Sequence, residues 1–95
     1  AVYATRGLVI NFGNNETAYF LPISRHAREA GFRAEIFPDK AKMKKQMSYA
    51  NAKNIPFVVL AGENEIEQGK ITLKNMESGE QQLVSADELI AAIKK

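Results

Sequence analysis

The segment Phe57-Val58-Val59-Leu60-Ala61 is apolar at every position. Pro56 precedes it and Gly62 follows it, so residues that interrupt regular structure bound it on both sides. A short run without polar positions is typical of a strand that is buried on both faces of a sheet. We therefore predict that residues 57–61 form a central strand of a sheet that helices cover.

Two strand–helix units precede this strand. Residues 7–12, which read Gly-Leu-Val-Ile-Asn-Phe, predict a first strand, and residues 16–30 carry apolar side chains at helical spacing. Residues 33–37 predict a second strand, and Met43 and Met47 belong to the apolar face of a second helix. Strand–helix–strand units pair their strands in parallel through right-handed crossovers. The first three strands are therefore predicted to be parallel.

Proline at position 22 lies well inside the first predicted helix. Beyond the first turn, a proline removes a backbone hydrogen bond and its ring collides with the preceding turn. We therefore expect the regular part of this helix to begin later than Glu16.

The pattern changes after the third strand. Residues 62–69 are too few and too acidic for another crossover helix, and we interpret them as a loop. Residues 70–74 alternate between polar and apolar, which predicts a strand antiparallel to its neighbour. Residues 77–80 form a turn, after which residues 81–84 can pair with residues 70–74 as a fifth strand. Residues 85–88, Ser-Ala-Asp-Glu, form a capping box that starts a third helix. The sequence thus predicts an α/β fold of three layers, a mixed five-stranded sheet flanked by three helices.

Length and composition limit the protein to a small set of classes. The 95 residues, 45% of them hydrophobic, suffice for one domain, which we place at residues 7–95, with residues 1–6 as a linker or expression remnant. The absence of cysteine excludes disulfides, thiolate metal sites and cysteine nucleophiles. No apolar run approaches the roughly 20 residues that span a bilayer, and the first residues do not resemble a secretory signal. We expect a cytoplasmic protein.

Catalytic and ligand-binding motifs are weak in this sequence. The single histidine, His26, lies among arginines inside the first predicted helix without a catalytic partner nearby. Glu63, Glu65 and Glu67 offer oxygen ligands for a cation, but their spacing matches no metal-binding loop. The turn at residues 13–15 lacks the repeated glycines of a dinucleotide site and the lysine of a phosphate loop. We predict no catalytic residue, no metal site and no cofactor in this domain.

Lysines gather at the start of the second predicted helix. Residues 40–53 contain five lysines and no acidic residue. Cations at the positive end of a helix oppose its dipole and repel each other, which suggests an anionic partner. Lys40 is a candidate for phosphate contact. Gln46, Tyr49 and Asn51 are candidates for hydrogen bonds or stacking with unpaired bases. A basic face that is simply solvated explains the composition equally well.

Residues 41–51, Ala-Lys-Met-Lys-Lys-Gln-Met-Ser-Tyr-Ala-Asn, and residues 55–65, Ile-Pro-Phe-Val-Val-Leu-Ala-Gly-Glu-Asn-Glu, resemble the C-terminal domain of histidyl-tRNA synthetases. In that family a basic helix, a proline, a valine-rich strand and an acidic loop bounded by glycines follow in the same order. The resemblance continues through residues 69–76 and 78–81 and covers residues 8–93.

The resemblance implies the same three-layer fold and a role in binding the anticodon stem-loop of histidine tRNA. It also implies that the ATP-dependent ligation of histidine to its tRNA, with ATP and magnesium, belongs to a separate class II catalytic domain. This fragment alone is therefore expected to be non-catalytic. The implied partners are the tRNA and the enzyme's own catalytic domain, and no membrane. Full-length enzymes of this kind are similar in being homodimers, whereas an isolated domain can be a monomer.

The resemblance also points to candidate RNA-binding residues. Related class II domains contact the anticodon at positions that match, without gaps, Lys40, Ser48, Asn54, Glu65 and Lys74. Glu65 can accept hydrogen bonds from a base. Lys74 stands where relatives often have arginine, and it lacks the planar bidentate geometry of a guanidinium. Ser48 and Asn54 depart from the basic residues that some relatives carry there.

In the leading interpretation, unpaired bases spread over the second helix and the sheet edge while Lys40, Lys44 and Lys45 hold phosphates. The same fold would also serve a prolyl, threonyl or glycyl enzyme, or a stand-alone paralogue with a regulatory role. A flavodoxin-like or receiver-like signalling or enzyme module would need acidic residues at the strand ends or a phosphate loop, and the sequence has neither. A protein-docking domain for an acidic partner is also compatible with the lysines.

Overall fold

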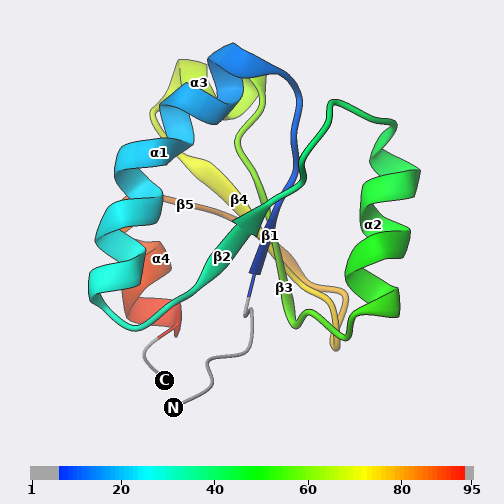
Figure 1. Cartoon of the computed structure of the whole chain (residues 1–95). Helices are drawn as coiled ribbons and strands as arrows, with labels where there is room; N and C mark the ends of the chain where they lie inside the picture. The colour runs from blue at the N-terminus through cyan, green and yellow to red at the C-terminus, as the bar shows by residue number, and fades with distance from the viewer. Residues whose placement is uncertain (1–6, 94–95) are drawn as a thin grey trace.

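The computed structural model describes residues 7–93; residues 1–6, predicted to be a linker, lie outside this range. A five-stranded sheet forms its centre (Figure 1). The strands are β1 (Gly7–Val9), β2 (Ala34–Ile36), β3 (Phe57–Leu60), β4 (Ile71–Asn75) and β5 (Gln81–Val84). Their order is β2-β1-β3-β4-β5, with β1, β2 and β3 parallel and with β4 antiparallel to both β3 and β5. The predicted mixed sheet with a central third strand is confirmed.

Helices lie on both faces of the sheet. They are α1 (Asn14–Glu29), α2 (Met43–Ala52), α3 (Glu63–Gln68) and α4 (Ala86–Ile93). α1 and α4 cover one face, α2 lies against the other, and α3 sits at the end toward which β1 and β3 run (Figure 1). One hydrophobic cluster joins the sheet to α1 and α4, and a second joins it to α2. The three predicted layers are therefore confirmed.

The acidic segment after β3 is a helix, so the structure has four helices where the sequence predicted three. The backbone N–H of Gly62 donates to Oε1 of Glu65 at 2.7 Å, which satisfies an amide at the start of α3. The carboxylates of Glu63 and Glu65 lie in the first turn, where their negative charges interact favourably with the positive end of the helix dipole. Gly69 adopts the left-handed conformation (φ 66°) that ends the helix. The loop prediction was wrong. It excluded a helix long enough to connect two parallel strands, but it did not consider a short helix of six residues that local capping stabilises.

Helix α1 runs without interruption through Pro22 and begins at Asn14, so the expected late start was wrong. The proline ring lies on the exposed side of the helix. Phe20 and Ala27, which are both fully buried, flank Pro22 in the sequence and belong to the same core cluster. Tertiary packing on both sides of the proline thus outweighs the lost backbone bond.

The predicted capping box at the start of α4 is confirmed. The N–H of Glu88 donates to Oγ of Ser85 at 3.1 Å, and the N–H of Ser85 donates to Oε1 of Glu88 at 2.9 Å. Hydrogen bonds to the Glu88 carboxyl from the backbone N–H and the side chain of Ser85 lower its pKa below the ordinary value, with a further contribution from the positive charge of Lys70. The start of the last helix is therefore set by local sequence.

Candidate nucleic-acid interface

The face of the sheet that carries α2 is only half covered. α2 is held over β1 and β2, because Gln46 is hydrogen-bonded to Asn11, just after β1, and Tyr49 to Glu35 of β2. On β4 and β5, four side chains that point to this face are half-buried or exposed: Thr72, Lys74, Gln81 and Leu83. Three alternate residues of the same strands are buried with α1 and α4: Ile71, Leu73 and Val84. We call the first set the open half of the sheet.

Strand register arranges the open half into rows. Residues directly opposite each other on antiparallel strands point to the same face. One row crosses three strands through Leu60, Thr72 and Leu83. The next row crosses them through Val58, Lys74 and Gln81. A row of two leucines and one threonine, which we call the apolar row, therefore lies beside a row that carries a cation and an amide.

Gln46, proposed from the sequence as a base contact, is completely buried, so that interpretation was wrong. Its Oε1 accepts the backbone N–H of Asn11 at 2.7 Å, and its Nε2 donates to the carbonyl oxygens of Asn11 and Ala41 at 3.0 and 2.9 Å. Nδ2 of Asn11 donates in turn to the carbonyl of Phe37 at 2.8 Å. These bonds tie the end of the first strand region to the segment that carries Lys40, and they explain why β1 ends before residue 12.

Tyr49 anchors α2 to the edge of the sheet. Its hydroxyl donates to Oε1 of Glu35 at 2.6 Å, and its ring packs edge-on against Phe37 with centroids 5.4 Å apart. The pKa of the Tyr49 hydroxyl is raised, mainly by the hydrogen bond to Glu35 and to a smaller extent by desolvation. With 100° per residue, Met47 lies on the opposite side of the helix from Tyr49, and Met43 lies one turn before it. The methionine side of α2 therefore faces the open half.

The seven candidate RNA-binding residues do not form one compact site. Five of them are exposed on α2 or beside its ends: Lys40, Lys44, Lys45, Ser48 and Asn54. Lys74 is half-buried in the open half, where it pairs with Val58 near the start of β3. Glu65 belongs to α3, beyond the last residue of β3. Glu65 and Lys74 thus lie toward opposite ends of the sheet.

Glu65 is half-buried, and its carboxylate has a structural task. Its Oε1 accepts the N–H of Gly62, so a base would have to use the other oxygen. The carboxylate also lies close enough to Tyr19 to raise the pKa of that phenol, in addition to the larger effect of burial. The hydroxyl of Tyr19 donates to the carbonyl of Lys70 at 3.0 Å. Any role of Glu65 in binding RNA is therefore combined with stabilising α3.

Asn54 terminates α2. Its φ of 55° is the one positive value among the non-glycine residues of the range 7–93. Its N–H donates to the carbonyl of Asn51 at 3.1 Å, and the N–H of Ile55 donates to that of Ala50 at 2.9 Å. This pair of bonds is a Schellman motif, in which asparagine tolerates the left-handed conformation better than other non-glycine residues. Residues 54–56, Asn-Ile-Pro, predict the end of the second helix, which the structure confirms; the left-handed backbone of Asn54 is what the structure adds.

We expect Asn54→Ala to lower the free energy of unfolding by about 1 kcal/mol, because alanine is strained at this φ. Urea unfolding monitored by circular dichroism measures the change. Asn54→Gly is the control, since glycine adopts the same conformation freely. Equal losses for both variants would show that the side chain, rather than the backbone conformation, matters at this position.

Other candidate sites receive no support in the described part of the chain. No group of three or more His, Asp or Glu side chains among residues 7–93 is placed to hold a metal ion, so the alternative of a cation at Glu63, Glu65 and Glu67 is not favoured. His26 is exposed on α1. No helix in the same range has the length and apolar character needed to cross a membrane.

Leu83 and Gln81 are site candidates that the sequence did not reveal. The strand over residues 81–84 was predicted, but its residues were not assigned to a face. That assignment needs the register Thr72↔Leu83 and Lys74↔Gln81, together with the position of α2.

Comparisons with known proteins agree with this architecture. A family model described as "Anticodon binding domain" matches residues 8–95. A histidine–tRNA ligase of Bacteroides fragilis is 66% identical over 95 residues, which are 100% of this chain and 21% of the relative. The solved histidyl-tRNA synthetase of Nostoc sp. PCC 7120 aligns with a TM-score of 0.87 at 30% identity, over 95% of this chain and 22% of the other.

A more distant structure shows the fold alone. The RNA-binding domain of threonyl-tRNA synthetase from Cryptosporidium parvum aligns with a TM-score of 0.81 at 22% identity, over 92% of this chain and 22% of that chain. The present chain spans about a fifth of the length of the relatives it matches.

Proposed function

The chain belongs to the anticodon-binding domain family, and from this premise we propose that it recognises the anticodon loop of histidine tRNA as part of a histidine–tRNA ligase. The identity of 66% to a histidine–tRNA ligase favours histidine tRNA over the tRNAs of the prolyl, threonyl and glycyl enzymes. The likeness to the threonyl enzyme is limited to the fold. The comparisons thus support a specific RNA as the partner.

The observation that carries the proposal is the lysine-bearing helix α2 beside the open half of the sheet. Lys44 and Lys45 are exposed in its first turn, and the first turn holds no acidic side chain. Lysines bind phosphates largely as point charges, whereas a sheet face with apolar and amide groups suits unpaired bases. Phosphate and base contacts are therefore available side by side.

The remaining features of the full-length enzyme belong to the same proposal. Histidine activation with ATP and magnesium, and transfer to the tRNA, take place in a separate catalytic domain, so this domain binds RNA without catalysing the reaction. The domain itself needs no cofactor. The full-length enzyme is a cytoplasmic homodimer, and the isolated domain is a monomer.

A binding titration tests the proposal directly. The chain is titrated with the anticodon stem-loop of histidine tRNA and with the same stem carrying a scrambled loop, each at two salt concentrations. We expect tighter binding of the correct loop and weaker binding at high salt, because each phosphate contact on single-stranded RNA contributes about 0.7 to the slope of log affinity against log salt. The absence of any salt-dependent binding to either RNA would refute the proposal.

Two substitutions distinguish binding of the phosphate charge from recognition of the loop sequence. Lys44→Ala is expected to weaken binding of every RNA similarly and to reduce the salt slope by about 0.7, the contribution of one phosphate contact. Glu65→Gln keeps an oxygen for the N–H of Gly62 but removes the negative charge. It is therefore expected to reduce the preference for the correct loop more than the overall affinity. If both variants bind all RNAs as the wild type does, these two residues are not part of the interface.

A further inference from the structure

Large apolar side chains are exposed at three positions in the range 7–92: Leu21 at 52%, Met43 at 37% and Leu83 at 41%. Leu83 belongs to the open half, and Met43 is on the side of α2 that faces it. Leu21 is on α1, which covers the opposite face of the sheet (Figure 1). Two of the three exposed apolar side chains therefore lie in the open half or on the side of α2 that faces it.

The apolar row is large enough to support a flat ring. Leu60, Thr72 and Leu83 follow each other across three strands at about 4.8 Å spacing, so the row is roughly 10 Å wide. Leu60 is half-buried against the core under α2, which leaves Thr72 and Leu83 as its outer members. A nucleic-acid base has an apolar face, which gains free energy when it is removed from water against such side chains.

The neighbouring row can read the edge of that ring. Lys74 and Gln81 lie two residues along their strands from Thr72 and Leu83, at about 7 Å. The amide of Gln81 carries both donors and an acceptor, which allows paired hydrogen bonds with a base edge. Gln81 is exposed, so its amide is accessible to a ligand.

We propose that the open half of the sheet holds one unpaired base of the bound RNA, with its face against Leu83 and its edge against Gln81. The inference rests on the proposed function and adds two specificity-determining residues to it. Charge favours RNA as the occupant, because α2 carries the exposed cations Lys44 and Lys45 and no acidic residue. A duplex does not fit the same site, since the faces of stacked and paired bases are not available to protein side chains.

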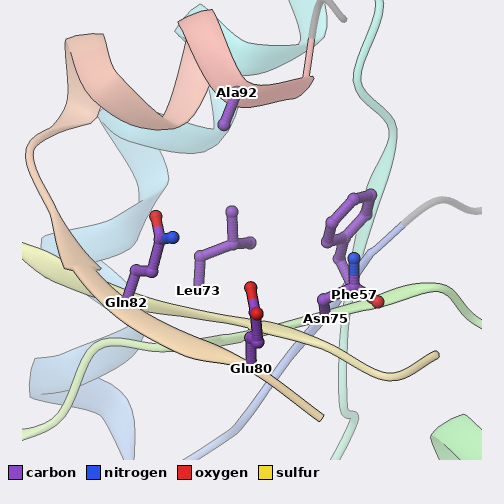
Figure 2. A pocket seen from close by; sticks show the side chains of 6 residues that line it. All are labelled: Phe57, Leu73, Asn75, Glu80, Gln82 and Ala92. Atoms are coloured by element: carbon purple, nitrogen blue, oxygen red, sulfur yellow. The ribbon is translucent and has the colours of Figure 1, made fainter. Parts of the chain in front are cut away.

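The chain contains a matched control for each residue. Gln82 follows Gln81 on the same strand and is also exposed, but it points to the opposite face of the sheet. Figure 2 shows Gln82 and Leu73 projecting toward the helix that carries Ala92. Both residues line a depression of about 190 Å³ on that side of the sheet. Leu21 matches Leu83 in type and exposure and lies on the other face. All four positions are exposed, so alanine is expected to leave the fold intact.

The test compares Leu83→Ala, Gln81→Ala, Leu21→Ala and Gln82→Ala in binding to the anticodon stem-loop of histidine tRNA, its scrambled-loop control and a fully paired hairpin stem. We expect Leu83→Ala to weaken binding of the stem-loop about tenfold without changing the salt slope. We expect Gln81→Ala to reduce the preference for the correct loop about tenfold. Leu21→Ala and Gln82→Ala should match the wild type.

Three outcomes would overturn the inference. If Leu83→Ala and Gln81→Ala behave like their controls while Lys44→Ala still weakens binding, no base lies on the open half, but the proposed function stands. Equal losses on the fully paired stem would assign these residues to the RNA backbone instead. If the wild-type chain binds none of the three RNAs, the proposed function and this inference fail together.

Discussion

Replacing Gln46 with leucine is expected to lower the free energy of unfolding by on the order of 3 kcal/mol. The substitution removes the partners of three backbone groups: the N–H and carbonyl of Asn11 and the carbonyl of Ala41. An unpaired buried polar group costs about 1–3 kcal/mol, and the added apolar burial of leucine offsets part of the sum. Urea unfolding at neutral pH, with the midpoint and slope fitted together, measures the change.

The control for this prediction is Ser48→Ala, two residues further along α2 on its exposed side. It is expected to change stability by no more than about 0.5 kcal/mol. A Gln46→Leu variant as stable as Ser48→Ala would contradict the role assigned to the buried amide. Because Gln46 bonds to Ala41, beside Lys40, the variant is also expected to bind RNA more weakly under conditions where it is still folded.

Gly7→Ala is expected to be the second most damaging change, at about 2 kcal/mol. A Cβ atom at this position would lie 2.5 Å from Cζ of Phe32, which is closer than real contacts allow. The ring of Phe32 is 2% exposed and packs edge-on against Phe57 with centroids 6.2 Å apart, so it has little room to move. Thermal and urea unfolding both report the loss.

A double mutant shows whether the clash itself causes this loss. Phe32→Leu removes the ring atoms that a Cβ at residue 7 would meet, although it creates a cavity of its own. If the two residues collide, Gly7→Ala should cost clearly less in the Phe32→Leu background than in the wild type. Additive effects would place the cause of the loss elsewhere.

The two faces of the sheet contribute differently to the protein. Under α1 and α4, β4 and β5 contribute fully or nearly buried apolar residues to the core. On the α2 side, the same two strands present Thr72, Lys74, Gln81 and Leu83. Strand alternation thus lets one hairpin serve stability on one side and, in our proposal, RNA binding on the other.

Much of the fold could be predicted because its signals are local. A continuous apolar run indicated the central strand, and the Ser-Ala-Asp-Glu sequence indicated the start of the last helix; both are confirmed. The two errors concern α3 and Pro22. α3 depends on a cap between Gly62 and Glu65, and α1 passes Pro22 because side chains on both sides of it are buried.

The candidate site was predicted less completely. The sequence by itself determined that the chain forms an α/β fold with a mixed sheet and that lysines gather at the start of α2, because hydrophobic periodicity and charge are local properties of the sequence. Only the tertiary structure decided that the Gln46 amide is buried against backbone groups, and that Gln81 and Leu83 share a face with Lys74. Which face a strand residue takes, and whether a polar side chain meets a backbone group or solvent, depend on register and packing between segments far apart in the sequence.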